Sequence, residues 1–267
     1  MEYVHGYGTS ESERLLAQAG SVLDLLHGDT SYPAGSLVLE VGCGTGAQTA
    51  SLAKNSPGAR FISFDHSATS LAQARARVSA TNVEFHQADL FALPFAPASF
   101  DHVFVCFVLE HLARPREALA ILERLLKPGG TITVFEGDHG PTSMYPDSEA
   151  AHKAIWCQVE LQRRAGGNAN IGRELYPLLK SAGFAQVHNS PRIVYVDASR
   201  PHLVDGFTRK TFAAMIEGVR EAALAARIID AETFDAGIRA LYRAAEPDGV
   251  FFYTFFKATG IRAPASR

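Results

Sequence analysis

The sequence has few cysteines and no hydrophobic run long enough to cross a membrane. Its 267 residues include three cysteines, Cys43, Cys106 and Cys157, and no two of them form a C-x-x-C pair. This odd, scattered set favours neither a disulfide framework nor a zinc site, and it is typical of reduced thiols. The N-terminal "MEYVHGYGTSESE" lacks an apolar signal core, and no apolar stretch approaches the ~20 residues that span a bilayer. We therefore expect a cytoplasmic protein without a membrane partner.

An excess of charge of one sign is also missing. Lys and Arg number 25 against 28 Asp and Glu, which gives a formal net charge of −3. This balance provides no broad basic surface for a nucleic-acid backbone and disfavours a polynucleotide partner. Hydrophobic residues make up 47% of the chain, enough for a sizeable core. We expect one α/β domain, as a monomer or homodimer, that acts on a small molecule.

Strand-like and helix-like stretches alternate between residues 37 and 136. Helical stretches follow the first, second and fourth strands, whereas the third connection, "DLFALPFAPAS", is too rich in proline for a long helix. This alternation predicts βαβ units and a mostly parallel sheet covered on both faces. The strand-like runs cover residues 37–41, 60–65, 83–87, 101–107 and 131–136.

Helices are expected on both sides of this alternating region. Before it, Ser10 and Glu13 form a capping box and Gly28 can end the helix that follows. After it, the helical block at 201–245 precedes the last strand, and we interpret this block as a lid or, equally, a dimer surface. The elements expected beyond residue 137 are helices at 147–165 and 172–182, a strand at 192–197, the helical block at 201–245 and a strand at 249–258.

Three alternate glycines follow the first predicted strand, in "LVLEVGCGTGAQTASLA". Gly42, Gly44 and Gly46 let the backbone approach a ligand, and the next helix offers N–H donors to anionic groups. The same stretch fits the permissive dinucleotide fingerprint Gly42-x-Gly44-x-x-Ala47, so a nicotinamide cofactor stays open. A tight turn without a ligand is the third interpretation.

Acidic residues lie before the glycines and at the ends of the next two strands. Asp65 follows Gly46 by 19 residues, where a carboxylate accepts hydrogen bonds from ribose hydroxyls; helix capping is the alternative. Asp89 would meet an adenine amino group or hold a turn. Glu40, on a central strand, would be a buried carboxylate that needs donors from the glycine loop or from the ligand's amino group.

Five segments in order, "LEVGCGTG", "FDHS", "ADLFALPF", "FDHVFVCFVLEHL" and "LLKPGGTITVFE", resemble the motif series of class I S-adenosylmethionine-dependent methyltransferases. The similarity is greatest to the small-molecule branch that includes ubiquinone and menaquinone C-methyltransferases. It implies S-adenosyl-L-methionine as cofactor and a doubly wound, mostly parallel seven-stranded α/β sheet of Rossmann-like type whose final strand is antiparallel. The domain 1–267 would then comprise an N-terminal cover segment at 1–30, a cofactor half at 36–137 and a substrate half at 138–267.

The resemblance also implies roles for residues that match the family's motifs. Glu40 and the three glycines would face the methionine end of the cofactor. Asp65, with His66 beside it, would bind the ribose. Asp89 and Leu90 would contact the adenine, with Leu90 packed on the ring.

Two further groups of residues are implied to line the cofactor and the substrate. Cys106 and Phe107 would lie near the sulfonium, although an apolar strand end explains them equally well. In the N-terminal segment "YVHGYG", Tyr7 is a candidate donor to the methionyl carboxylate, and Tyr3 and His5 are candidate substrate contacts. A disordered or merely packed tail is the alternative for all three.

Methyl transfer from a sulfonium is an in-line displacement that alignment and exclusion of water promote without a covalent enzyme intermediate. A base is needed only if the nucleophile carries a proton that it must lose. The segment "FEGDHG" offers Glu136, Asp138 and His139 as candidates for catalysis, and the alternative is a solvated loop capped by Asp138 and His139. No second cluster of ligand residues supports a metal.

Two downstream residues are candidate substrate contacts. Trp156, which shares a helix face with His152 and Val159, would form an aromatic wall or belong to the core. Arg173, after the loop "GGNANIG", would hold a substrate carboxylate or make a surface salt bridge. The downstream segments "EGDHG", "GGNANIGRELYPLL" and "FTRKTFAAMIEGVRE" also resemble a bacterial group containing methyltransferases of indole and other aromatic natural products.

The sequence therefore predicts methyl transfer to a small acceptor that is aromatic or contains nitrogen. The alternatives are an NAD(P)-dependent oxidoreductase and a cofactor-binding protein without chemistry.

Overall fold

A seven-stranded sheet with the strand order β3-β2-β1-β4-β5-β7-β6 organises the fold. The computed structural model describes residues 22–264, so the expectations for Tyr3, His5 and Tyr7 lie outside the described residues. Strands β1 to β5 pair in parallel, and β7 is antiparallel to both of its neighbours, β5 and β6. The expected sheet and its antiparallel last strand are confirmed. The strands are β1 Leu37–Val41, β2 Arg60–Asp65, β3 Val83–Gln87, β4 Phe100–Cys106, β5 Leu126–Tyr145, β6 Phe184–Val196 and β7 Val250–Arg262.

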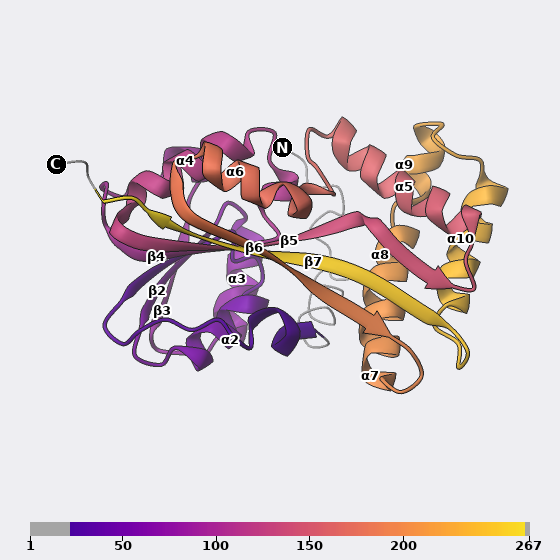
Figure 1. The fold of residues 1–267 in the computed structure, drawn as a ribbon, viewed down its shortest axis with the longest axis horizontal. Helices are drawn as coiled ribbons and strands as arrows, with labels where there is room; N and C mark the ends of the chain where they lie inside the picture. The colour runs from indigo at the N-terminus through magenta and orange to yellow at the C-terminus, as the bar shows by residue number, and fades with distance from the viewer. Residues whose placement is uncertain (1–21, 265–267) are drawn as a thin grey trace.

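Helices cover both faces of the parallel part of the sheet (Figure 1). Alternate residues of β4 explain why both faces are buried: Phe104 joins the apolar cluster on the side of α2, and Val105 joins the cluster on the side of α4 and α6. The third connection contains the short 3-10 helix η1 Leu90–Ala92, as its prolines predict. The covering helices are residues 22–27, α2 Ala47–Asn55, α3 Ala68–Arg77, α4 Pro115–Leu125 and α6 Leu175–Ser181.

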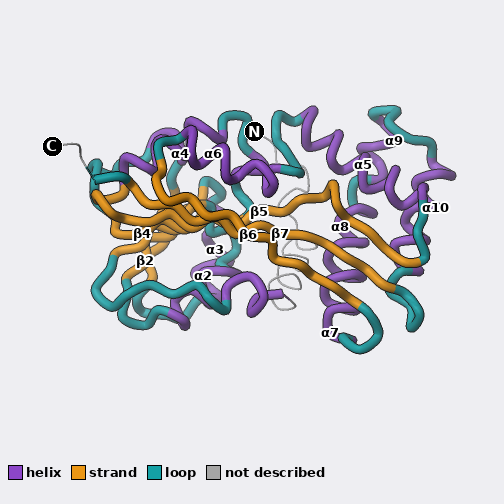
Figure 2. Tube along the Cα trace, viewed as in Figure 1, coloured by secondary structure: helices purple, strands orange, loops and turns teal. Residues whose placement is uncertain are grey.

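Strands β5, β6 and β7 continue beyond the parallel sheet as an antiparallel ribbon, visible in the right half of Figure 2. Their predicted bounds were too short: β5 runs through the glycines of "KPGG" and, with a register shift, through "EGDHGP". Pairing with β7 stabilises these Gly- and Pro-containing stretches, and local sequence does not report that pairing.

The far end of this ribbon packs against helices that include the predicted helical block at 201–245 (Figure 1). This block is helical, and it includes a ten-residue π-helix, η4. The elements are α5 Glu149–Arg164, α7 Pro201–Leu203, η4 Val204–Ala213, α8 Ala214–Glu217, α9 Arg220–Ala225 and α10 Ala231–Arg243.

Candidate functional site

The three glycines after β1 adopt left-handed backbone conformations for different reasons. Gly42, with φ +63°, lies so close to Val108 that an added Cβ would come 2.6 Å from Cγ2. Gly46, with φ +76°, packs on α3, where an added Cβ would lie 3.1 Å from Ala74. Gly44, with φ +51°, has no described atom within 4 Å of its Cβ position. Gly44 alone therefore leaves room over the backbone for atoms of a ligand.

Two side chains hold this loop in place. The backbone N–H of Gly44 donates to Oδ2 of Asp65 at 2.9 Å. From the last turn of α3, the guanidinium of Arg77 donates to Oγ1 of Thr45 at 2.7 Å and also to the Thr45 carbonyl. The sequence analysis missed Arg77, because a basic residue in a last helical turn has no feature that distinguishes it.

Asp65 ends β2 at the edge of the sheet that carries the glycine loop. It is 8% exposed, and its Oδ1 accepts from the N–H of Ser67 at 2.8 Å. The side-chain cap of α3 is Ser67, which accepts from Ser70, so the capping alternative for Asp65 is wrong. His66 lies with Nδ1 3.3 Å from Oδ1 of Asp65 and has a largely exposed side chain.

Glu40 is a buried carboxyl on β1 with two hydroxyl donors. Ser63 donates to Oε2 at 2.6 Å and Thr49 donates to Oε1 at 3.0 Å. Burial raises the pKa of Glu40 to about 7, although both hydrogen bonds oppose the shift. These two donors lie on β2 and α2. Among the described residues, the expected hydrogen bonds from the glycine loop to Glu40 are not observed.

Asp89 and Leu90 occupy the turn after β3. Oδ1 of Asp89 accepts from the N–H of Phe91 at 2.9 Å and caps η1, which is the turn role named as its alternative. Leu90 is 7% exposed and belongs to the apolar cluster on the α4 side of the sheet. Contact of either residue with an adenine remains a prediction.

Cys106 and Phe107, at the end of β4, lie in different surroundings. Cys106 is in the core, with Sγ 4.0 Å from Nε2 of His27. Phe107 is half-buried, and its φ of +56° is a strained conformation for a bulky residue, of the kind that occurs at functional sites. Phe107 is therefore the better placed of the two for the cofactor role.

Glu136 on β5 organises the segment that follows Phe107. Its Oε1 accepts from the N–H groups of Val108 at 3.0 Å and Leu109 at 2.7 Å, at the start of the 3-10 helix η2 Leu109–His111. Burial, with the neighbouring Glu110 carboxyl, raises the pKa of Glu136 well above its ordinary value. Glu136 is buried and its Oε1 is occupied by two backbone N–H groups, so the structure favours a positioning role.

Asp138 and Arg173 pair with each other. The guanidinium donates from Nε to Oδ2 at 2.6 Å and from NH2 to Oδ1 at 2.6 Å, and Gly140 N–H donates to Oδ1 at 3.0 Å. Asp138 is 1% exposed. Each side chain is therefore held by the other in the described structure, and catalysis by Asp138 and substrate binding by Arg173 stay predictions. For Arg173, the salt-bridge alternative is the observed one.

His139 is buried, so the solvated-loop alternative is wrong for this residue. Its Nδ1 lies 3.1 Å from the carbonyl oxygen of Ala169 and 3.1 Å from the hydroxyl of Tyr253. The sequence analysis missed Tyr253, although strand alternation in "GVFFYTFFKA" places it between Phe251 and Phe255 on one face. A polar tip in an aromatic row was the available signal.

Trp156 lies on the outward face of α5 and is 53% exposed. The core alternative for Trp156 is wrong, because spacing aligns it with His152 without showing which face of the helix is buried. The buried residues of α5 include Ala151, Ala154, Ile155 and Gln158.

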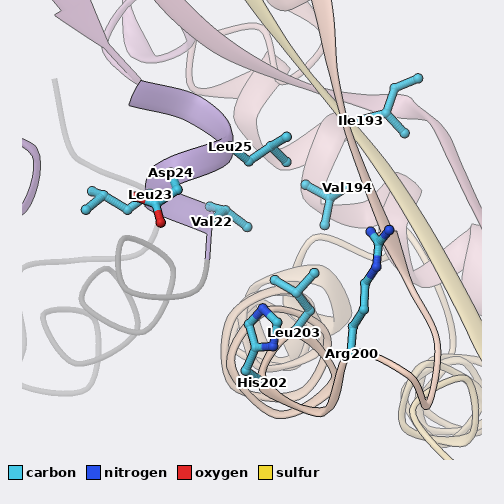
Figure 3. Close-up of a pocket in the computed structure, with 9 residues that line it drawn as sticks. All are labelled: Val22, Leu23, Asp24, Leu25, Ile193, Val194, Arg200, His202 and Leu203. Carbon is cyan, nitrogen blue, oxygen red and sulfur yellow. The ribbon is translucent and has the colours of Figure 1, made fainter. Parts of the chain in front are cut away.

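A hollow of about 360 Å³ lies between residues 22–25, β6 and α7 (Figure 3). None of the predicted site residues that fall within residues 22–264 lines it. Within residues 22–264, no group of three or more His, Cys, Asp or Glu side chains is arranged to hold a metal ion. No helix in this range is long and apolar enough to cross a membrane.

Comparisons with known proteins identify the family of the chain. A family model described as a methyltransferase domain matches residues 39–134. A 2-phytyl-1,4-naphthoquinone methyltransferase of Thermosynechococcus vestitus is 34% identical over 173 residues, which cover 60% of this chain and 76% of the relative. An uncharacterised 37.1 kDa protein of a Streptomyces fradiae transposon is 34% identical over 200 residues, 73% of this chain and 57% of that protein.

Among solved structures, the [4+2]-cyclase SpnF matches with a TM-score of 0.59 and 21% identity, over 93% of this chain and 83% of the cyclase. This similarity concerns the fold alone. In four of the curated relatives, the matched part amounts to between 24% and 57% of the relative's own length.

Proposed function

Because the chain belongs to the class I S-adenosylmethionine-dependent methyltransferases, we propose that it transfers a methyl group from S-adenosylmethionine to a small aromatic acceptor. The observation that carries the proposal is the loop after β1, in which Gly44 is the one of the three glycines with no described atom within 4 Å of its Cβ position, and in which its N–H donates to Asp65. A nucleoside-bearing cofactor needs such an opening at the carboxyl ends of parallel strands. The chain's own residues fill the space beside the other two glycines.

We assign the cofactor's contacts along this edge from the glycine loop to the end of β4. The methionine part would lie by Gly44, the ribose by Asp65, and the adenine by Asp89 and Leu90. Phe107, in its left-handed conformation, would face the reacting end. The cofactor supplies a methyl group activated by a positively charged sulfur. Tyr7 and the cover segment at residues 1–30 remain candidates for closing the site.

The chain's contribution to the reaction is alignment and exclusion of water. Glu136 fixes the backbone of Val108 and Leu109, which adjoin Phe107. Of the three candidate catalytic residues, we assign proton transfer to His139, since Asp138 is paired with Arg173. The aromatic rings of Phe207, Phe212 and Phe255 pack against Tyr253, the ring of Phe251 packs against Phe212, and together they shield this region. The helices at 201–245 that carry two of these rings are candidates for a lid.

We propose a reduced quinone or another hydroxylated aromatic ring as the first acceptor class. The named activity of the Thermosynechococcus relative and the aromatic surroundings of His139 support this choice. Aromatic rings that contain nitrogen form the second class, because the segments near Arg173 resemble methyltransferases of indole-like compounds.

Incubation with methyl-labelled S-adenosylmethionine and a panel of acceptors tests the proposal. The panel contains reduced naphthoquinones, phenols, indoles and, as negative controls, aliphatic amines and carboxylates. We expect label in an organic-extractable product of at least one aromatic acceptor, together with one equivalent of S-adenosylhomocysteine. The Asp65→Ala variant, checked for folding, serves as the matched control and should lose cofactor affinity. Transfer of label only to aliphatic acceptors would contradict the proposed substrate class.

A further inference from the structure

The hollow between residues 22–25, β6 and α7 has a buried apolar floor and an exposed apolar rim (Figure 3). Val22, Val194 and Leu203 form the floor, and all three are buried. Leu25 and Ile193 form the rim and are 38% and 48% exposed. The volume of about 360 Å³ lies within the range of about 300–1,000 Å³ that is usual for small-molecule sites. The hollow is therefore large enough for a small ligand.

Exposed hydrophobic side chains are concentrated at this hollow. Within residues 22–264, six large hydrophobic side chains are exposed, and two of them, Leu25 and Ile193, line the hollow. A third, Tyr195, lies next to it, because the guanidinium carbon of Arg200 is 5.7 Å from the centre of the Tyr195 ring. The other three lie on β5, α5 and α6. Apolar side chains gathered on an exposed concave surface are typical of a binding site.

The hollow lies on the same face of the antiparallel ribbon as Tyr253. Val194 is the register partner of Tyr253 across β6 and β7, and directly paired residues of antiparallel strands project to the same face. Leu203 and Phe207 belong to one apolar cluster, and the ring of Phe207 packs 5.8 Å from that of Tyr253. A ligand in the hollow would thus lie beside the aromatic cluster and away from the glycine loop.

Arg200 brings a cation to this apolar surface. Its Nη1 donates to the carbonyl oxygen of Tyr195 at 2.9 Å, and within residues 22–264 the guanidinium makes no other hydrogen bond or ion pair. Hydrogen bonds from Ser199 and, to a smaller extent, the charge of Arg200 lower the pKa of Asp197, so this carboxylate lies near Arg200 without pairing with it. The remaining N–H groups of Arg200 are donors for an anion.

Two further polar side chains line the hollow. Asp24 is the one carboxylate among its lining residues in the described part of the chain, and Figure 3 shows it on the side of helix 22–27 that faces away from Arg200. His202, on α7, contributes a ring N–H donor. The polar groups contributed by α7 and the residue before it are therefore donors, which match an anionic ligand.

We propose that this hollow binds a small organic anion with an apolar body, of the aryl carboxylate type, and that Arg200 binds the anionic group. The proposal goes beyond methyl transfer, because the hollow is separate from the residues assigned to the cofactor. Two kinds of molecule have this chemistry: an acceptor that carries a carboxylate, and a separate ligand that is not methylated.

Calorimetric titration of the full chain with 1-naphthoate tests the site, with 1-naphthamide as the uncharged control ligand. We expect 1-naphthoate to bind at least about tenfold more tightly than the amide and to lose about tenfold in Arg200→Gln, the effect of one charge-assisted hydrogen bond. Arg116→Gln, which removes the same charge from an exposed position on α4, should bind like wild type. Absence of 1-naphthoate binding, or equal affinity of Arg200→Gln and wild type, would overturn the proposal.

Methyl NMR locates the bound ligand. The signal of Ile193, assigned with Ile193→Val, should shift on addition of 1-naphthoate, whereas that of Ile132, buried in the sheet, should not. A shift at Ile132 with none at Ile193 would place the ligand elsewhere and overturn the proposal.

Inhibition of methyl transfer separates the two kinds of ligand. Competition between 1-naphthoate and the methyl acceptor would assign the hollow to the acceptor's own carboxylate, and non-competitive inhibition would assign it to a separate ligand. Both results retain the site. If no acceptor is methylated, the proposed function fails, and the binding of 1-naphthoate still decides whether the hollow is a site for an anion.

Discussion

The backbone of Gly42 lies against the side chain of Val108, where an added Cβ would come 2.6 Å from Cγ2. Val108 belongs to the segment that Glu136 fixes through its backbone N–H. The tight contact therefore links the glycine loop of β1 to the segment after β4, the two sides of the proposed cofactor site. Gly44, two residues further along, has no described neighbour within 4 Å of its Cβ position.

Alanine at these two glycines should give opposite patterns. Gly42→Ala adds a clash and a left-handed alanine, and should lower the free energy of unfolding by about 2–4 kcal/mol. Gly44→Ala adds only the backbone strain, about 1–2 kcal/mol, but its Cβ enters the proposed ligand space and should weaken S-adenosylhomocysteine binding at least tenfold. Urea denaturation and calorimetry measure the two quantities. Equal effects of both substitutions on stability and affinity would contradict the division of roles.

Removal of Arg173 should destabilise the protein. Arg173→Gln leaves the buried Asp138 carboxylate without its cation, and we expect a loss of about 2–3 kcal/mol, below the usual cost for fully buried pairs because Arg173 is half exposed. The double variant Asp138→Asn/Arg173→Gln should recover part of this loss. Wild-type stability of Arg173→Gln together with a raised KM for the acceptor would contradict the structural role and support substrate binding by Arg173.

Glutamine at position 136 should be nearly neutral. The pKa of Glu136 lies well above its ordinary value, so glutamine reproduces the neutral form and its oxygen still accepts from Val108 and Leu109. We expect a change below about 1 kcal/mol in stability and turnover within a few-fold of wild type. Glu136→Ala, which leaves both N–H groups without this acceptor, should cost about 2–4 kcal/mol. A large loss of turnover in Glu136→Gln at native stability would show that the carboxylate acts in catalysis.

Two buried groups should affect acid stability in opposite directions. Burial lowers the pKa of His27 from 6.5 to about 4, so the unfolded chain binds the proton first and this term raises stability as pH increases from 4 to 6.5. Burial raises the pKa of Glu40 from 4.5 to about 7, so the unfolded chain loses this proton first. The contribution of Glu40 therefore lowers the free energy of unfolding as pH increases from 4.5 to 7. Each amounts to about 1.4 kcal/mol per pH unit at most.

His27→Phe keeps a ring against Phe135 and removes only the His27 term. Relative to wild type, its unfolding free energy should fall with increasing pH between 4.5 and 6.5. Glu40→Gln should show the reverse, a relative rise. Chemical denaturation at four pH values in this interval measures both slopes, and parallel curves for wild type and His27→Phe would contradict the assignment.

Local sequence predicted the parallel half of the sheet well, because each buried strand is an apolar run bounded by turn residues. β1, β2 and β3 have the expected ends. The ends of β5 and β6 were not predictable, since their outer parts depend on pairing with β7, more than 100 residues beyond β5. Trp156 shows a second limit, because helical spacing identifies residues that share a face without telling whether that face is buried.

The sequence predicted which residues lie together at this edge of the sheet, but not the partners that their side chains contact. Asp65, Glu40 and the glycines come together at one edge of the sheet, as parallel strand ends require. Partners distant in the chain were missed: Asp138 binds Arg173, 35 residues away, and His139 contacts Tyr253, 114 residues away. No periodicity indicates such contacts, so the ion pair between Asp138 and Arg173 could not be predicted from the sequence.

Calorimetric titration of the purified chain with S-adenosylhomocysteine, run beside NADH and NADPH in the same buffer, tests the central claim most directly. The account predicts one binding site for S-adenosylhomocysteine, weakened at least tenfold in Gly44→Ala, and no heat of binding with either nicotinamide cofactor. Binding of NADH or NADPH alone would contradict the account, since the glycine loop would then serve an oxidoreductase.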